Sequence, residues 1–164
     1  MPDAKPLIIL GIDPGLANTG WGIIEQAGSN RRALAYGCIT TDADSGIAIR
    51  LKQIYDEVNA VIERYRPTEL AIEAVYFGSN TQSALSTGQA RGAALVAAAA
   101  RELVIGEYSP TQVKQMIVGE GRAHKQQVQY MVRVLLALDH VPAPDHASDA
   151  LAAALCHARM RRIP

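Results

Sequence analysis

The chain has 164 residues, 49% of them hydrophobic and 20% charged, a composition that excludes a disordered chain and fits one globular domain. Lysine plus arginine and aspartate plus glutamate number 16 each, so the net charge by itself indicates no nucleic-acid partner. The two cysteines form no CxxC pair, and the apolar stretch 93–100 is far shorter than the roughly 20 residues of a membrane span. These features predict a cytoplasmic protein with a single domain over residues 1–164.

The first half of the chain carries strand patterns on both sides of one helix pattern. Residues 7–12 are almost continuously apolar, which is typical of a strand covered on both faces, and the run stops at the turn sequence Asp13-Pro14-Gly15. Apolar side chains recur at helical spacing over residues 49–65, and Pro67 ends this predicted helix. The predicted strands of this half are 7–12, 19–24, 34–41 and 70–75.

The second half is dominated by helix patterns. A long helix, rich in small residues that suit close packing on a sheet, is predicted from Ser79 or Asn80 to about residue 101. Ser109-Pro110-Thr111-Gln112 supplies an N-cap, a proline at the first helical position and a glutamine at the third, which is a strong helix start. A strand is predicted at 103–107 and further helices at 125–138 and about 145–161. This order of elements predicts an α/β fold with a mixed five-stranded sheet flanked by helices, hairpins first and crossovers after.

Acidic side chains stand at three places where they could carry chemistry. Asp13 follows the first predicted strand and is either a turn residue or a functional acid. Glu73 lies inside an apolar strand pattern, where it faces solvent or else needs a cation or hydrogen-bond donors. Asp145, His146 and Asp149 open the last predicted helix; acids of a first turn commonly stabilise the helix end, but Asp149 lies one turn deeper. A pair of oxygen-preferring divalent ions needs such groups on separate elements, although spacing alone does not show that they converge.

Six short blocks carry the strongest functional signal of the sequence. They are GIDPG (11–15), TGWG (19–22), AIE (71–73), GQARG (88–92), QVKQ (112–115) and DALA (149–152). In this order they resemble the RuvC family of bacterial Holliday junction resolvases, and the likeness runs from residue 7 to about residue 157. The resemblance implies an RNase H-like nuclease domain, a homodimer, and Mg²⁺- or Mn²⁺-dependent cutting of two opposed strands of a four-way DNA junction in recombination and repair.

The resemblance also implies the site residues. The metal-site positions of the family fall on Asp13, Glu73, His146 and Asp149, with two ions, Mg²⁺ or Mn²⁺, in each site. Aspartate is the commoner residue at the third position, and the neighbouring Asp145 shares a helix face with Asp149 as well. We assign the position to His146 by register. Because imidazole is softer than carboxylate, His146 predicts relatively better activity with Mn²⁺ than with Mg²⁺.

Basic and aromatic residues near these positions are candidates for contact with DNA. Lys114 and Lys125 match family lysines that approach DNA near the catalytic site, and Arg122 lies between them in sequence. Without the resemblance, all three would be interpreted as parts of solvated helix faces. Tyr76 occupies the aromatic position of the family and Phe77 stands beside it, so the pair is predicted either to stack on junction bases or to pack in the core.

Other functions stay open on the sequence alone. A related RNase H-like nuclease could act on RNA instead of junction DNA. An actin-like nucleotide-binding protein also begins with an Asp-x-Gly turn after its first strand, although such proteins need two lobes of this kind. Contact with the RuvA–RuvB branch-migration complex is implied by the family alone.

Overall fold

The computed structural model describes residues 4–74 and 80–161, and within them five strands form one mixed sheet. The strands are β1 (Leu7–Asp13), β2 (Asn18–Ala27), β3 (Asn30–Thr40), β4 (Glu69–Glu73) and β5 (Val104–Tyr108). Their order across the sheet is β3-β2-β1-β4-β5. The first three are antiparallel neighbours, whereas β4 runs parallel to β1 and β5 runs parallel to β4. The predicted mixed sheet, with hairpins first and crossovers after, is therefore confirmed.

The helices of the described residues are α1 (Ile47–Tyr65), α2 (Thr81–Ala100), α3 (Pro110–Val118), α4 (Lys125–Leu135) and α5 (Asp145–Met160). The cap of α2 is Asn80, and α3 begins with the predicted capping box of Ser109 and Gln112. α4 ends earlier than predicted because the backbone turns left-handed at Ala137, with a φ of 51°. The apolar pattern had suggested a longer helix, since Leu136 and Leu138 still pack on the core beyond its end. None of these helices is both long and apolar enough to cross a membrane.

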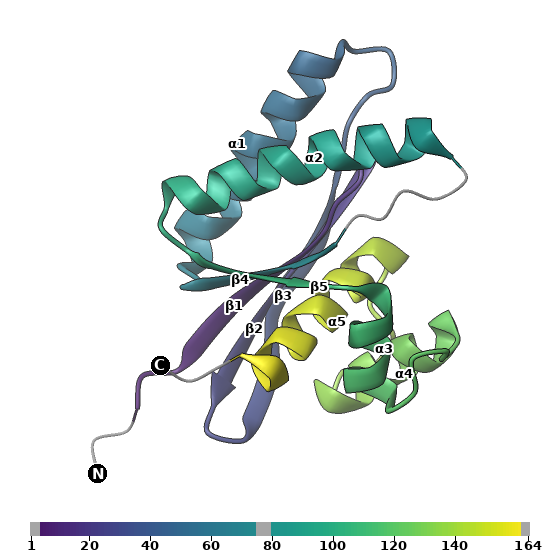
Figure 1. Cartoon of the computed structure of the whole chain (residues 1–164). Helices are drawn as coiled ribbons and strands as arrows, with labels where there is room; N and C mark the ends of the chain where they lie inside the picture. The colour runs from purple at the N-terminus through teal and green to yellow at the C-terminus, as the bar shows by residue number, and fades with distance from the viewer. Residues whose placement is uncertain (1–3, 75–79, 162–164) are drawn as a thin grey trace.

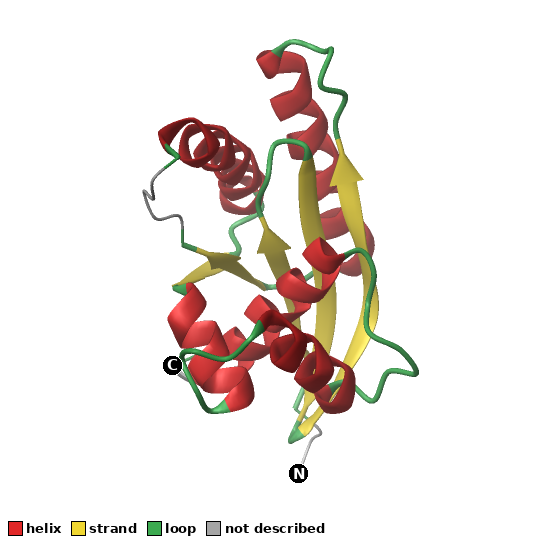
Figure 2. Cartoon of the chain, turned by 90° about the vertical axis from the view of Figure 1, so that its right-hand side faces the viewer, coloured by secondary structure: helices red, strands yellow, loops and turns green. Residues whose placement is uncertain are grey.

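The helices form two layers, one on each face of the sheet (Figure 1, Figure 2): α1 and α2 cover one face, and α3, α4 and α5 cover the other. Alternate residues of a strand point to opposite faces. Leu10 and Ile12 of β1 therefore pack with α1 and α2, while Ile9 packs with the α5 layer. The same alternation directs Asp13, at the end of β1, toward α5.

α5 lies unusually close to the sheet. A Cβ atom at Gly11 would overlap the carbonyl oxygen of Ala150, and one at Gly20 would overlap the carbonyl oxygen of His146. A Cβ at Gly22 would come within 2.5 Å of Leu151 Cδ2. Glycine at these strand positions thus lets the helix backbone approach the strands more closely than any other residue would allow.

The small residues of α2 serve two different surfaces. Ala90, Ala94 and Ala98 are fully buried in the core between α2, α1 and the sheet, which confirms the predicted close packing. Gly88 and Gly92 do not take part in it, because a Cβ atom at either position would meet nothing within 4 Å. For these two glycines the packing prediction was wrong, since they lie on the open side of the helix.

Candidate functional site

Two carboxylates stand at the ends of neighbouring parallel strands. Asp13 is the last residue of β1 and Glu73 is the last residue of β4. Ile12 and Ile72, the residues just before them, are partners in the ladder between these strands. Because parallel strands end at the same edge of a sheet, two acids that are far apart in sequence become neighbours, and both lie on the α5 face.

The remaining acid and the histidine come from the first two turns of α5. His146 Nδ1 lies 3.0 Å from Asp13 Oδ2, and Asp149 follows on the next turn. Gly20 is paired with Asp13 in the β1–β2 ladder, so its missing side chain leaves room for the backbone of His146 directly beside the acid. The beginning of α5 is thereby fixed over the ends of β1 and β4.

The site concentrates negative charge in a partly buried position. Burial and then the charge of Asp149 raise the pKa of Asp13 to about 6, against a smaller lowering by the hydrogen bond with His146. Burial, followed by the charges of Asp13 and Asp149, raises the pKa of Glu73 to about 7. The pKa of Asp149 is raised as well, chiefly by burial. Clustered acids with raised pKa values are typical of functional sites.

Two lysines share a hollow with these acids. Lys114 and Lys125 line a space of about 220 Å³ together with Glu73 and Asp149. Lys125 Nζ lies 3.5 Å from Oδ2 of Asp149 and 3.5 Å from Oδ2 of Asp145. Both lysines lower the pKa of Glu73, although less than burial and the other acids raise it. A hollow with acids and lysines in its wall can take up a phosphate group together with cations.

The donor atoms are of the kind that holds a divalent ion. Carboxylate oxygens suit Mg²⁺ and Mn²⁺, and an imidazole nitrogen is tolerated by the softer Mn²⁺. As the side chains lie, no three or more acidic, histidine or cysteine groups among residues 4–74 and 80–161 are placed to hold an ion. Two of these side chains have other partners: His146 is engaged with Asp13, and Lys125 lies beside Asp149. Three carboxylates and one imidazole are nevertheless donor types that such an ion accepts.

The two candidates for the third metal position have different neighbours. His146 faces Asp13, and its side chain is 43% exposed. The side chain of Asp145 is 64% exposed and is directed to Lys125 instead. The assignment of His146 made by register is therefore the one that brings this position next to Asp13.

The other sequence candidates lie apart from this cluster or outside the described residues. Arg122 is exposed in the turn before α4 and does not line the hollow. Tyr76 and Phe77 fall within 75–79, outside the described residues. Sequence reasoning missed Gly11 and Gly20 as determinants of the site. A signal existed, because a glycine two residues before a strand-end acid, on the same face, leaves space for a close neighbour.

Known proteins resemble the chain over almost its whole length. The family model described as crossover junction endodeoxyribonuclease RuvC matches residues 9–157. The RuvC protein of Heliobacterium modesticaldum is 53% identical over 150 residues, which cover 92% of this chain and 93% of that protein. The RuvC protein of Pelotomaculum thermopropionicum is 50% identical over 152 residues, 93% of each chain.

The fold agrees with that of a solved relative. The structure of Thermus thermophilus RuvC in complex with Holliday junction substrate matches with a TM-score of 0.88 and 37% identity, over 93% of each chain. This match confirms the predicted RNase H-like fold. The family model, the sequence relatives and the solved structure agree, and the chain belongs to the RuvC family of crossover junction endodeoxyribonucleases.

Proposed function

We propose that this chain, as one nuclease domain over residues 1–164, resolves four-way (Holliday) DNA junctions by paired hydrolytic nicks in homologous recombination and repair. The observation that carries the proposal is the convergence of Asp13, Glu73 and Asp149 next to two lysines. Family membership supports the reaction, and a relative from Thermus thermophilus has been solved with Holliday junction substrate. Such a substrate also fits the predicted location in the cytoplasm.

We assign the metal site to Asp13, Glu73, His146 and Asp149, which would hold two ions, Mg²⁺ or Mn²⁺. The partly buried negative charge of these acids supports the assignment, because a cation would relieve the repulsion that contributes to the raised pKa values of Asp13 and Glu73. Two such ions supply an activated water and stabilise the leaving oxygen of the phosphodiester.

The lysines and the histidine have their own tasks in the reaction. Lys114 and Lys125 bind the phosphate that is cut, since both line the hollow beside Glu73. When Lys125 turns from Asp149 to an incoming phosphate, it brings positive charge to the DNA and frees a carboxylate oxygen in one movement. In the protein without an ion, His146 hydrogen-bonds Asp13 and lowers the pKa of that carboxyl group, which favours the ionised form that a divalent ion needs.

Three further residues extend the proposed DNA surface. Arg122 is exposed in the turn that leads into α4, so its guanidinium is free to reach a phosphate outside the hollow. Tyr76 and Phe77 are assigned to stacking on junction bases by the family resemblance alone. Contact with the RuvA–RuvB complex likewise rests on family membership.

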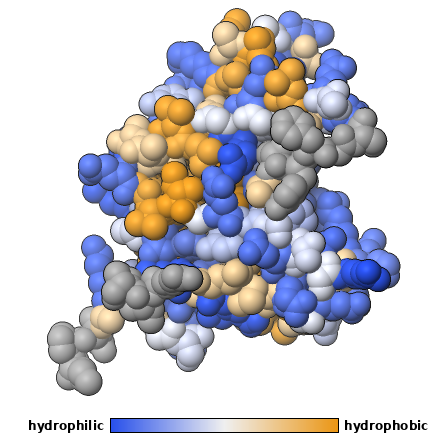
Figure 3. Space-filling model, viewed as in Figure 1, coloured by the Kyte–Doolittle hydropathy of each residue, from blue (hydrophilic) through white to orange (hydrophobic). Residues whose placement is uncertain are grey.

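The homodimer is supported by an unpartnered face of α2. Leu85 and Val96 are 62% and 59% exposed, and Gly88 and Gly92 lie between them at helical spacing, open to solvent. Val104, on the edge strand that follows α2, is 62% exposed. Figure 3 shows apolar surface over the side of the molecule on which α2 lies. A stripe of small residues flanked by apolar ones suits close packing of the same helix from a second copy about a two-fold axis.

The function is tested with a panel of three substrates: a synthetic mobile four-way junction, a linear duplex of the same sequence and an RNA–DNA hybrid. With Mg²⁺ or Mn²⁺, we expect cuts in the junction alone, and we expect Asp13→Asn to abolish them. Cutting of the hybrid or of RNA, with the junction intact over several branch sequences, would refute the assigned substrate and favour the RNase H-like alternative.

A further inference from the structure

A second hollow lies beside His146 and shares no lining residue with the lysine-lined one. Its volume is about 380 Å³. Residues of four separate segments form its wall: the turn between β1 and β2 with the first residue of β2, the start of α1, the first two turns of α2, and His146 of α5. The polar side chains among them are Asn18, Arg50, Ser83, Ser86, Thr87 and His146, and none of the described residues that line the hollow is acidic.

Arg50 is held in place at this hollow by its Nε atom. Arg50 Nε donates to Thr41 Oγ1 over 2.8 Å, and Thr41 Oγ1 donates to the carbonyl oxygen of Leu16 over 2.6 Å. Thr41 is buried, so this chain of hydrogen bonds is fixed to the β1–β2 turn that carries Asp13 at its start. A guanidinium oriented through Nε keeps its two terminal nitrogens for another acceptor.

No carboxylate of the described residues provides that acceptor. Like several other arginines, Arg50 forms no ion pair within residues 4–74 and 80–161, and its side-chain hydrogen bond among these residues is the one from Nε to Thr41. Arg50 is half-buried and lines the hollow together with Ser83, Ser86 and Thr87 of α2. The Ser86 hydroxyl donates to the carbonyl oxygen of Ser83, so Ser83 and Thr87 are the hydroxyl donors left for a ligand. Guanidinium together with hydroxyl donors, without an acid, is the combination that binds phosphate oxygens.

We propose that this hollow binds a backbone phosphate of the junction strand that is cut, close to the scissile phosphate, with Arg50 as the charged donor and Ser83 and Thr87 as the neutral ones. The inference rests on the proposed function. His146 lines this hollow and also contacts Asp13, so the hollow adjoins the carboxylates. A second fixed phosphate would align the strand before the cut. Arg50 is thus a substrate-binding residue outside the metal site.

The first test asks whether the effect of removing the Arg50 charge depends on the charge of one particular phosphate. Single neutral methylphosphonates are placed in turn along the cut strand, and junction binding without divalent ions and single-turnover cleavage with Mn²⁺ are measured for the wild type and Arg50→Gln. We expect one position at which the neutral linkage weakens wild-type binding about tenfold and leaves Arg50→Gln unaffected. The dependence of log affinity on log salt should also fall by about 0.9 in Arg50→Gln.

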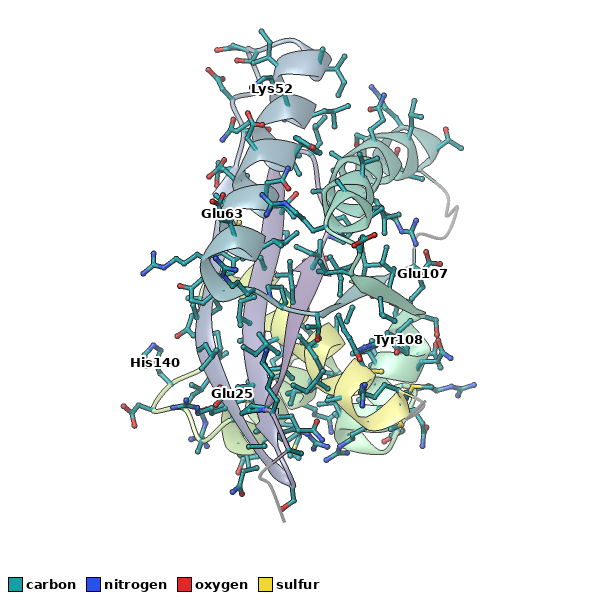
Figure 4. The ribbon with its side chains drawn as sticks, turned by 90° about the vertical axis from the view of Figure 1, so that its left-hand side faces the viewer. Glu25, Lys52, Glu63, Glu107, Tyr108 and His140 are labelled. Atoms are coloured by element: carbon teal, nitrogen blue, oxygen red, sulfur yellow. The ribbon has the colours of Figure 1, made fainter. Side chains whose placement is uncertain are left out.

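Lys52→Gln is the matched control. Lys52 lies on the same helix (Figure 4), but its side chain is 76% exposed and is paired with Asp56. It does not line the hollow. Lys52→Gln removes the same charge as Arg50→Gln. We expect each methylphosphonate to change junction binding by Lys52→Gln as much as it changes binding by the wild type. Equal salt dependence of Arg50→Gln and Lys52→Gln, with no coupled position, would overturn the proposal.

A second pair of variants works even if Arg50→Gln does not fold. Ser83→Glu places a carboxylate at the hollow, on an exposed position of the first turn of α2, where an acid favours the helix. Gln82→Glu adds the same charge one residue earlier, outside the hollow. We expect Ser83→Glu to weaken junction binding about tenfold more than Gln82→Glu at 0.15 M salt, where the screening length is about 8 Å. Equal affinities would refute the phosphate site. A wild type that cuts no junction would instead refute the proposed function.

Discussion

At the scale of single residues, the decisive feature is a group of carboxylates in surroundings that disfavour their ionised forms. Asp13, Glu73 and Asp149 are drawn together at the strand ends, where burial and mutual repulsion disfavour their ionised forms. Among residues 4–74 and 80–161, Lys114, Lys125 and His146 are the groups that offset this charge. An arrangement of this kind costs stability in the free protein and favours the binding of cations.

The cost at Glu73 can be measured as a function of pH. Its pKa rises from 4.5 to about 7 on folding, so ionisation destabilises the fold as the pH rises from 4.5 to 7, and below 4.5 the carboxyl group is neutral in both states. We expect Glu73→Gln to raise the free energy of unfolding by on the order of 3 kcal/mol at pH 8 in EDTA, while abolishing cleavage. Denaturant unfolding at pH 4 and pH 8 measures the difference, which should vanish at the lower pH. An equal effect at both would contradict the assignment of charge.

The histidine predicts the metal preference. His146 supplies a softer donor than the aspartate common at this position, so the wild type should work relatively better with Mn²⁺ than with Mg²⁺. We expect His146→Asp to reduce the ratio of the Mn²⁺ rate to the Mg²⁺ rate several-fold. Initial rates of junction cleavage over a titration of each ion decide this. A wild type clearly faster with Mg²⁺, or a ratio unchanged in the variant, would contradict the assigned role.

At the scale of elements, the depth of α5 on the sheet sets the site. Its first turns lie over Gly20, and its last turn is anchored through His157, whose Nε2 lies 2.5 Å from Glu69 Oε2 and whose Nδ1 lies 2.6 Å from the hydroxyl oxygen of Tyr108. Figure 4 shows Tyr108 on β5, near the helices of this layer. Arg161 closes the network with paired hydrogen bonds to Glu69. Because α5 is fixed at both ends, His146 and Asp149 lie at a defined distance from the sheet.

Moving α5 away from the sheet should therefore reduce the cleavage rate more than it reduces the stability of the fold. We expect Gly20→Ala to reduce cleavage by more than a hundredfold while costing about 1–3 kcal/mol of stability, because the added methyl group overlaps the backbone of His146. Gly46→Ala is the control, since a Cβ there meets nothing within 4 Å, and it should keep nearly full activity. Single-turnover rates and denaturant unfolding of both variants test this. Full activity in Gly20→Ala would show that the depth of α5 is not critical.

The elements themselves were largely predictable because their signals are local. The apolar run at 7–12, the capping residue Asn80 and the Ser109–Gln112 box each specify a strand or a helix start by nearby chemistry alone. The end of α4 was not predictable from the apolar pattern. The left-handed backbone at Ala137 brings Leu138 onto the core, although the helix has already ended. The approach of α5 also depends on contacts between distant segments.

The site was predictable only in part for the same reason. Spacing in the sequence left Asp13 as a possible turn residue and Glu73 as a possible surface acid, and family resemblance alone joined them. The pairing of β1 with β4 brings the two together, and that pairing is a tertiary event. The hollow at Arg50 gave no sequence signal, since it is formed by four segments that meet only in the folded chain.

At the scale of the whole molecule, the open face of α2 predicts how two sites are combined. We expect Val96→Glu to yield monomers in size-exclusion chromatography with light scattering, because it places a charge on the exposed apolar face of α2. The monomer should keep its fold and lose paired cleavage. Val134→Glu on α4, 44% exposed on the other layer, is the control and should stay dimeric. A dimeric Val96→Glu would place the interface elsewhere.

The most direct measurement of the central claim uses a supercoiled plasmid with an extruded cruciform that carries several branch sequences. A single nick releases the supercoiling and leaves a nicked circle, whereas two opposed nicks made within one binding event leave a linear product. With Mg²⁺ or Mn²⁺ we predict linear plasmid as the main product, and none with EDTA or with Asp13→Asn. A nicked circle as the main product, or an intact cruciform under all of these conditions, would contradict the account of a two-site junction resolvase.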